Sequence, residues 1–404
     1  MKVSPIIAVI ISSLFSLSIT GQETADSSKT KTQVTFAYPI GSNGAEAKNM
    51  ENNFSFNILY GVNGELNGLE FGTLVNVVKG NANGFQFVGL TNVVEGAFYG
   101  VQFAGINNVI QDSLIGMQFS GISNLVPEQT VGAQIAGITN FTKNELSGTQ
   151  ISGISNFASK RIKGAQITGI SNVANGKCEG AQIAGIHNLT TGNLTGAQIA
   201  GLYNQTQDTL QGAQIGLVNS AHVMHGFQLG LINVADSSTG VSVGLLSLIK
   251  NGYHAVELYT NEVLPANAAI KIGTDQFYNI YQGGFDYENP HLFGFGMGFG
   301  TKLRLADWIS ISADLTANHI NELEKFEWKV NLLSRADLTF DLHLNQHIGL
   351  TFGPSLNAHI SELGYESTGG FTTDIAVNPF FTDSYNGYQL QMWIGAKGGL
   401  RITF

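Results

Sequence analysis

Two histidine pairs are the first candidates for metal chemistry in this chain. His222 and His225 stand three residues apart, and His343 and His347 flank the end of a predicted strand. Neutral imidazole is a common metal ligand, but an isolated pair is more often a surface feature than a metal site. We therefore predict no metal ion at either pair.

Charged side chains alternate along one predicted strand near the C-terminus. Arg335, Asp337 and Asp341 share one face of this strand, because successive strand residues point to opposite sides. Carboxylates that catalyse hydrolysis need a cleft around them, and nothing in the sequence locates one. We expect these three residues to line the interior of a barrel as an ion-paired plug.

The usual motifs of nucleotide, zinc and calcium sites give no further candidates. We recognise no Gly-rich phosphate loop, CxxC, HExxH, GxSxG or EF-hand loop in the chain. We predict that the protein is not an enzyme, and we assign it no catalytic, cofactor-binding or metal-binding residue and no cofactor.

Composition argues against a nucleic-acid partner. The net charge of the 404 residues is −10, and the densest basic stretch is only Lys160-Arg161-Ile162-Lys163. Binding to phosphates needs clustered Lys and Arg. Gly is abundant, with 50 residues, but 43% of the chain is hydrophobic and periodic, so we expect a folded core.

The first residues are typical of an exported protein. Lys2 is followed by an apolar stretch from Ile6 to Ile19 and by small residues at Thr20 and Gly21. This pattern predicts a secretory signal peptide over residues 1–21, with a membrane anchor as the alternative. The single cysteine, Cys178, cannot form an internal disulfide, so stability in an oxidising compartment must come from packing or from a membrane.

A 16-residue repeat fills the middle of the chain and shortens to 14 residues at its end. Its first glycine recurs at a fixed spacing: Gly68, Gly84, Gly100, Gly116, Gly132, Gly148, Gly164, Gly180, Gly196 and Gly212, then Gly226 and Gly240. Gln follows two places later and Asn eight places later, as in Gln134 and Asn140. Large apolar residues stand three and six places after the glycine, and Cys178 occupies an apolar slot fourteen places after it.

Two β architectures could use this unit. In a β-solenoid each unit is one coil, so that Ile stacks on Ile inside while Asn and Gln form hydrogen-bonded ladders. Twelve coils would make a rod on the order of 55 Å long. The alternative is one large outer-membrane β-barrel with one unit per strand, but the rims then lack aromatic girdles. We favour the solenoid.

The pattern Gly-x-Gln-φ-x-Gly-φ-x-Asn, from Leu66 to about Ser247, resembles an uncharacterised surface-repeat family of Gram-negative bacteria. The resemblance implies placement at the surface or outer membrane. It implies no activity.

Strict alternation of apolar and polar residues replaces the repeat after Tyr253. Leu338, Phe340 and Leu342 face one way, and the last strand has Leu400, Ile402 and Phe404 on its apolar face. Long alternating strands and a final aromatic residue are typical of an outer-membrane β-barrel, and a soluble β-sandwich is the alternative.

The sequence as a whole predicts an all-β protein: a repeat β-solenoid followed by an antiparallel β-barrel-like domain. We divide it into a signal peptide (1–21), a segment with capping strands (22–63), the array (64–250) and the antiparallel domain (251–404). We expect an outer-membrane or surface structural protein that displays a repetitive polar face to an extended ligand, a glycan or a protein. The alternatives are a pore or transport barrel with a repeat appendage, and a secreted solenoid hydrolase.

Overall fold

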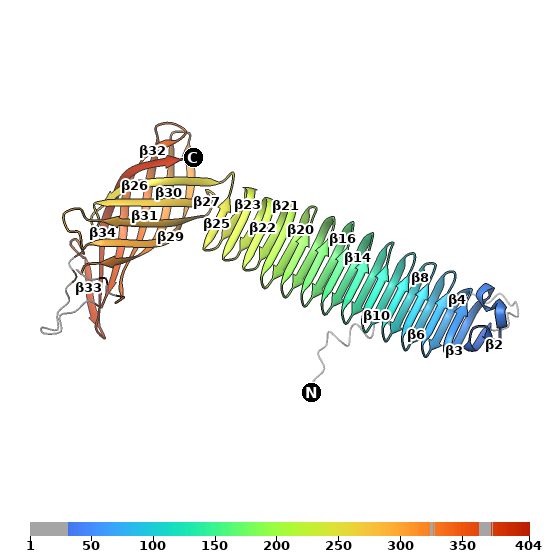
Figure 1. Cartoon of the computed structure of the whole chain (residues 1–404). Helices are drawn as coiled ribbons and strands as arrows, with labels where there is room; N and C mark the ends of the chain where they lie inside the picture. The colour runs from blue at the N-terminus through green and yellow to red at the C-terminus, as the bar shows by residue number, and fades with distance from the viewer. Residues whose placement is uncertain (1–30, 324–325, 327, 363–372, 374) are drawn as a thin grey trace.

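The computed structural model describes residues 31–323, 326, 328–362, 373 and 375–404. It has two parts, a long rod of parallel strands and a barrel of antiparallel strands at its C-terminal end (Figure 1). The predicted fold class, a solenoid followed by a barrel, is confirmed, and the alternative of a single large barrel is wrong. The predicted signal peptide lies outside the described residues.

The rod begins with a short folded cap. Its elements are β1 (Thr32–Ala37), β2 (Ile40–Gly41), the 3₁₀ helix η1 (Gly44–Asn49) and β3 (Glu51–Asn63). The first half of β3 pairs in parallel with β4 and its second half with β5, so β3 forms a complete coil. The parallel stack therefore starts before the first recognisable repeat.

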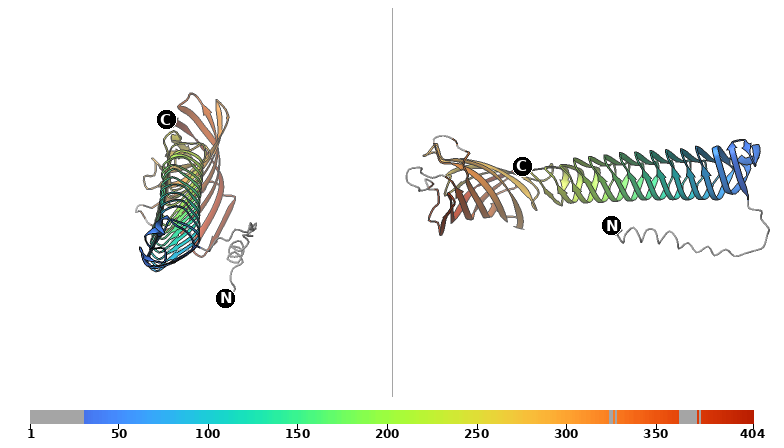
Figure 2. Two further views of the ribbon diagram at one scale, coloured as in Figure 1. Left: turned by 90° about the vertical axis from the view of Figure 1, so that its right-hand side faces the viewer. Right: turned by 90° about the horizontal axis from the view of Figure 1, so that it is seen from below.

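Each repeat unit forms one coil with a long strand and a short strand. The long strands are β4 (Glu65–Gly72), β6 (Ala82–Val88), β8 (Phe98–Ala104), β10 (Leu114–Ser120), β12 (Thr130–Ala136), β14 (Glu145–Ser152), β16 (Arg161–Thr168), β18 (Lys177–Ala184) and β20 (Leu194–Ala200). The short strands are β5 (Val75–Val78), β7 (Thr91–Val94), β9 (Asn107–Ile110), β11 (Ser123–Val126), β13 (Thr139–Thr142), β15 (Ser155–Ala158), β17 (Ser171–Ala174) and β19 (His187–Thr190). Long strands stack on long strands and short on short, which makes a flattened rod (Figure 2, left).

The last coils contain the 14-residue units. Their strands are β21 (Tyr203–Ile215), β22 (Val218–Leu229), β23 (Ile232–Ser238), β24 (Val241–Val243) and β25 (Leu246–Ile249). Asn204 still pairs with Asn219 and Gln214 with Gln228, so the repeated residues stay in register although the coil is shorter.

Glycine is required where successive coils approach most closely. Gly148 has a φ of +144°, and a Cβ placed on it would lie 1.9 Å from the carbonyl oxygen of Gly132. An L-residue is strained at this φ, and no atom fits in this space. The first glycine of each unit thus lets the coils stack directly upon one another.

The antiparallel domain is a closed eight-stranded barrel. Its strands are β26 (Tyr253–Asn261), β27 (Ala266–Gly273), β28 (Tyr278–Phe285), β29 (Phe293–Ala306), β30 (Ile309–Asn321), β31 (Asn331–His343), β32 (Ile348–Ser361) and β34 (Tyr388–Thr403), and β33 (Phe381–Tyr385) forms a hairpin with β34. Pairing of β26 with β34 closes the barrel.

The two ends of the barrel differ. The segments 274–277, 307–308 and 344–347 are short turns at one end, where β26 begins and Phe404 donates its backbone N–H to the His254 carbonyl. The short connection 262–265 and the longer segment 286–292 lie at the other end, where β30 also ends and β31 begins. In the sequence, residues 322–330 separate β30 from β31 and residues 362–380 separate β32 from β33, and both stretches are longer than the turns at the first end. The array joins the barrel at the short-turn end and extends away from it (Figures 1 and 2).

Candidate functional site

Two columns of buried amides run through the interior of the array. Gln150 Nε2 donates to Gln134 Oε1 at 2.8 Å, in the direction of the N-terminus. Asn140 Nδ2 donates the opposite way, to Asn156 Oδ1 at 3.0 Å and to the Ile151 carbonyl at 2.8 Å. These Gln and Asn side chains are fully buried. The predicted ladders are confirmed, and they are structural.

The Gln column ends at a carboxyl group. Glu70 occupies the Gln position of the first unit and accepts hydrogen bonds from Gln86 at 2.7 Å, Asn57 at 2.8 Å and Asn63 at 2.6 Å. Three amide donors converge there, and a carboxyl group can accept from all of them. Burial raises the pKa of Glu70 to about 7, and the hydrogen bonds from its neighbours oppose that shift.

The large apolar residues of the repeat lie outside the coil, and the prediction that Ile stacks on Ile inside is wrong. Ile151 is 38% exposed and Ile154 is 44% exposed. Because strand side chains alternate, an inward Gln150 requires an outward Ile151. The interior is filled instead by the amides and by smaller apolar clusters, such as Leu146 with Ala158.

We call the two outward columns the apolar ridge. It consists of Phe71, Phe87, Phe103, Phe119, Ile135, Ile151, Ile167, Ile183, Ile199, Ile215 and Leu229, and of Leu74, Leu90, Ile106, Ile122, Ile138, Ile154, Ile170, Ile186, Leu202, Leu217, Leu231 and Leu245. A column of glycines separates its two rows, and shallow grooves follow them, one at residues 87–89 and 103–105 and another at residues 215–217, 229–231 and 243–245. The most regular outward side chains of the array are therefore apolar, not polar as predicted.

The opposite edge of the array is charged. Apart from Glu70, every Asp, Glu, Lys and Arg from Gly68 to Lys250 stands 10 to 15 places after the first glycine of its unit. Ion pairs connect neighbouring coils there, as between Lys79 and Glu95 at 2.5 Å and between Arg161 and Glu179 at 2.9 Å. The flattened rod thus has one apolar edge and one charged edge.

The candidate metal ligands in the array have ordinary partners on this charged edge. His222 Nδ1 lies 2.6 Å from Asp236 Oδ2, and His225 Nδ1 lies 2.7 Å from Thr239 Oγ1. Among the residues that the structure describes, no group of three or more His, Cys, Asp or Glu side chains could hold a metal ion.

Cys178 is buried, as predicted. Its side chain stacks between Ile162 and Leu194 in one apolar cluster, and burial raises the pKa of its thiol to about 12. Such a thiol is a poor nucleophile.

Residues 240–244 match the Gly-x-Ser-x-Gly pattern of hydrolase nucleophiles, a match that the sequence analysis missed. Ser242 takes the Gln position of the last coil, is 1% exposed and donates to Gln228 Oε1 at 3.0 Å. The hydroxyl group therefore terminates the ladder and does not face a substrate.

The barrel interior is filled by ion pairs. Lys271 contacts Glu257 at 2.6 Å and Asp314 at 2.7 Å, and Lys397 contacts Glu257 at 3.0 Å. Arg401 is paired with Asp341. The interior of an eight-stranded barrel is narrow enough for side chains to fill it.

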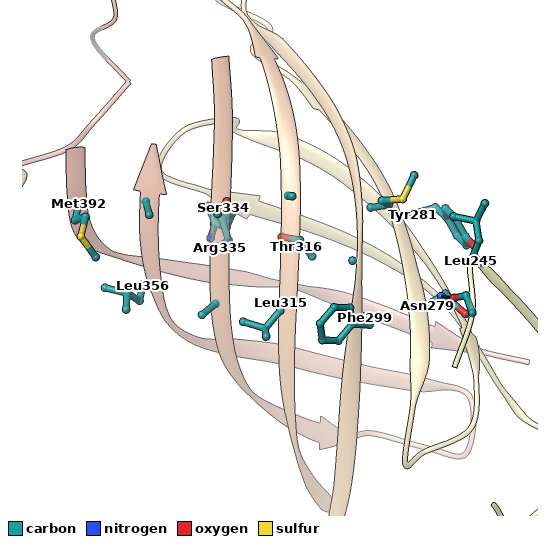
Figure 3. A pocket seen from close by; sticks show the side chains of 16 residues that line it. Leu245, Asn279, Tyr281, Phe299, Leu315, Thr316, Ser334, Arg335, Leu356 and Met392 are labelled. Atoms are coloured by element: carbon teal, nitrogen blue, oxygen red, sulfur yellow. Dashed lines mark hydrogen bonds between the residues drawn. The ribbon is translucent and has the colours of Figure 1, made fainter. Parts of the chain in front are cut away.

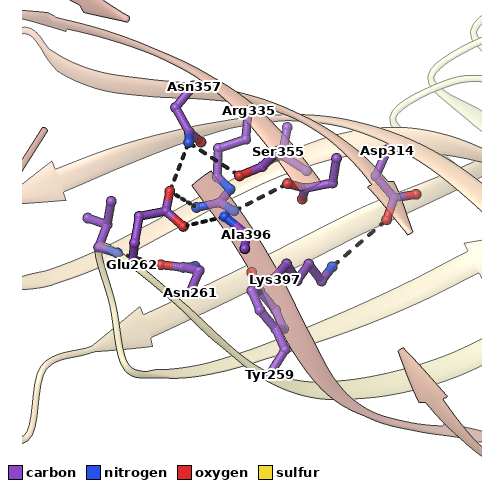
Figure 4. Close-up of polar contacts among 12 residues, drawn as sticks. Tyr259, Asn261, Glu262, Asp314, Arg335, Ser355, Asn357, Ala396 and Lys397 are labelled. Atoms are coloured by element: carbon purple, nitrogen blue, oxygen red, sulfur yellow. Dashed lines mark hydrogen bonds and ion pairs between the residues drawn. The ribbon is translucent and has the colours of Figure 1, made fainter. Parts of the chain in front are cut away.

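A second cluster lies closer to the long-loop end (Figure 4). Arg335 contacts Asp337 at 3.2 Å and Glu262 at 3.4 Å, and Glu262 accepts from Asn357 at 2.8 Å and from the Trp393 indole at 3.1 Å. The expected plug of Arg335, Asp337 and Asp341 is confirmed, although Asp341 pairs with Arg401 and not with Arg335.

The outer wall of the barrel is apolar. Phe299, Leu315 and Ile394 are 48%, 50% and 71% exposed, and their strands turn charged residues inward. Such a barrel is the reverse of a soluble β-sandwich, whose apolar residues face one another.

The apolar ridge meets this wall at the end of the array. Asn279 Nδ2 donates to the Gly244 carbonyl at 2.7 Å, and the Tyr281 hydroxyl donates to the Leu245 carbonyl. Leu245 lines one hollow together with barrel-wall residues such as Phe299 and Leu315 (Figure 3). The last coil is therefore attached to the outside of β28.

Comparison with protein-family models, with curated proteins and with solved structures gives no match. The resemblance to the surface-repeat family stays a prediction. Among the described residues, no helix is long and apolar enough to cross a membrane.

Proposed function

We propose that this protein is a non-enzymatic outer-membrane protein in which the barrel anchors a rigid rod. The observation that carries the proposal is the inverted barrel, with Phe299 and Leu315 on its wall and Lys271 and Asp314 paired inside. Lipid favours apolar side chains, and buried charges need partners. In water the same wall would expose a large apolar area with nothing to cover it.

The barrel ends support an orientation. Bacterial outer-membrane barrels have short turns on the periplasmic side and longer loops outside. Here the array joins the end with the short turns 274–277, 307–308 and 344–347. We propose that the rod extends in the periplasm and that the loops face outward.

A structural role is favoured over a pore. Glu257, Asp314 and Arg401 are at most 2% exposed and are engaged by oppositely charged side chains, so paired charges occupy the described part of the lumen. An extended glycan or protein ligand on the repeat remains a proposal. Such a ligand would meet the apolar ridge or the charged edge, since the Gln and Asn ladders are buried.

Refolding of the full chain into lipid vesicles tests the anchor. Leu315→Arg places a charge in the middle of the wall, which costs about 2–4 kcal/mol in a membrane barrel, and it should lower the inserted fraction strongly. The matched control Leu303→Arg lies nearer the short-turn end of β29 and should insert almost normally. Equal insertion of both variants, or none of the parent protein, would contradict the proposed anchor.

A further inference from the structure

We infer that the apolar ridge lies against the lipid bilayer that holds the barrel, so that the rod rests along the membrane. This inference rests on the proposed membrane anchor and adds a second lipid-contacting surface to it. Its occupant is the lipid surface itself.

Continuity with the barrel wall is the first argument. The last ridge residue, Leu245, lines the same hollow as Phe299 and Leu315, which face outward on the barrel (Figure 3). The groove along the ridge includes Gly244 and Leu245 as well. If the wall is in lipid, the start of the ridge is in or next to lipid, and the polar groups of Asn279 and Tyr281 between them are hydrogen-bonded to the last coil.

The attachment of the last coil is the second argument. Asn279 and Tyr281 hold it through side chains that point away from the barrel interior, close to the start of β28. This places the coil beside the wall near the short-turn end, where the barrel would leave the membrane. The rod then runs off laterally (Figure 1).

The separation of charge is the third argument. All charged side chains of the repeats except the buried Glu70 lie on the edge opposite the ridge. A body with one apolar and one charged edge is stable at a membrane–water interface, with the apolar edge among the acyl chains and the charged edge in water. Charges on this edge pair with one another, as Lys177 does with Glu179 at 2.8 Å.

The size of the ridge is the fourth argument. Ile154, Ile170 and Ile186 are each 41–45% exposed, and equivalent residues recur in successive coils. Exposed apolar residues thus continue along the whole array, whereas the largest apolar patch of a soluble monomer is typically a single area of about 300–600 Å². A surface of this length needs an extended partner, and a bilayer provides one.

Lipid contact can be measured with single cysteines in the full chain, reconstituted in vesicles of phosphatidylethanolamine and phosphatidylglycerol that contain a nitroxide-labelled acyl chain. Ile170→Cys lies on the ridge and Asn175→Cys on the charged edge of the same coil, and each takes an environment-sensitive fluorophore. The native Cys178 is fully buried and should stay unlabelled. The emission of the label at position 170 should shift to shorter wavelength, and the nitroxide should quench most of it. The emission of the label at position 175 should be quenched only slightly.

Charged variants give a second readout. Ile154→Glu, Ile170→Glu and Ile186→Glu together should abolish quenching of a label at Ile167→Cys. The matched triple Ser159→Glu, Asn175→Glu and Thr191→Glu on the charged edge should leave that quenching unchanged.

The outcomes separate the two proposals. An inserted barrel with an unquenched label at 170 overturns the ridge inference and leaves the anchor intact. A label at position 170 with blue-shifted but unquenched emission, together with disulfide cross-linking between molecules of the unlabelled Ile170→Cys variant, assigns the ridge to a second copy of the chain and also overturns the inference. A barrel that does not insert overturns both proposals.

Discussion

Hydrogen bonds between side-chain amide groups connect the successive coils of this protein. Within the repeats, an interior Gln or Asn donates to one neighbouring coil and accepts from the other, as Gln150 does from Gln166 and to Gln134, each at 2.8 Å. The two columns run in opposite directions, so their dipoles oppose one another. Buried amides are costly unless they are paired, so each rung depends on its neighbours.

Removal of one rung should therefore destabilise the array. Gln150→Leu leaves the Gln166 amide without its acceptor, and we expect a loss of about 2–3 kcal/mol. The adjacent Ile151→Gln is on the exposed ridge and should change the free energy of unfolding by about 0.5 kcal/mol or less. Unfolding in urea, followed by circular dichroism, measures both. A larger cost for Ile151→Gln would show that the two faces are reversed.

Glu70 should make the stability of the array depend on pH. Its pKa is about 7 in the folded chain against 4.5 for the ordinary group, so the folded state holds the proton more tightly. The stabilisation is complete below pH 4.5, decreases as the pH rises to 7 and is constant above. A pKa difference of about 2.5 corresponds to a stability difference of about 3.4 kcal/mol at most.

The control for this pH dependence is Glu70→Gln, which cannot titrate. Melting temperatures of the parent chain and this variant at pH 5 and pH 8 test whether Glu70 causes the pH dependence. The parent should lose stability between the two values and the variant should not. A parallel decrease in both would assign the effect to other groups.

At the scale of the strand, the sequence specified the repeat but not which face is inside. The constant spacing of Gln134 and Asn140 was enough to predict coils in register, because a solenoid places each position above its own copy. Strand alternation, however, allows two opposite assignments of inside and outside. The general preference for buried hydrophobic residues selected the assignment with Ile151 inside. This assignment is wrong because paired amides fill the interior.

The barrel strands show the same ambiguity with a different outcome. Alternation grouped Arg335, Asp337 and Asp341 correctly, and the charged face had to be the inner one of a small barrel for these residues to find partners. The pairing of Asp341 with Arg401 could not be predicted, since it depends on strand order and register across the closed sheet.

Substitution of the first glycine of a unit should break the stack. Gly148→Ala would place a methyl group 1.9 Å from the Gly132 carbonyl oxygen at a φ of +144°. We expect a loss of more than about 3 kcal/mol, since strain and overlap add. Gly44 has a φ of +57° and no atom within 4 Å of an added Cβ, so Gly44→Ala introduces backbone strain without steric overlap. This control should cost about 1 kcal/mol. Similar melting temperatures for both variants would contradict the close stacking.

The whole molecule combines a one-dimensional stack with a closed barrel. Each coil contacts only its two neighbours, so the stack can in principle gain or lose whole units without loss of register. The barrel has no such freedom, because β26 must meet β34 to close it. The length of the rod is therefore adjustable, and the anchor is not.

Deletion of whole units tests this modularity. Removal of residues 149–164 joins Gly148 to Ala165 and restores the repeat, so the chain should fold with a rod shorter by about 4.8 Å. Removal of residues 149–156 eliminates half a coil and both of its amides, and it should lower the melting temperature sharply. If both deletions are tolerated equally, the coils are not the units of stability.

The central claim is that the barrel holds the rod in a membrane, and an alkaline carbonate wash of the membrane fraction tests it most directly. Bacterial cells that make the full chain are lysed, and their membranes are washed beside those of cells that make Leu315→Arg. The account predicts that the parent protein stays in the pellet and that the variant is depleted there. Release of the parent protein into the wash would contradict the membrane anchor and, with it, the lipid contact of the apolar ridge.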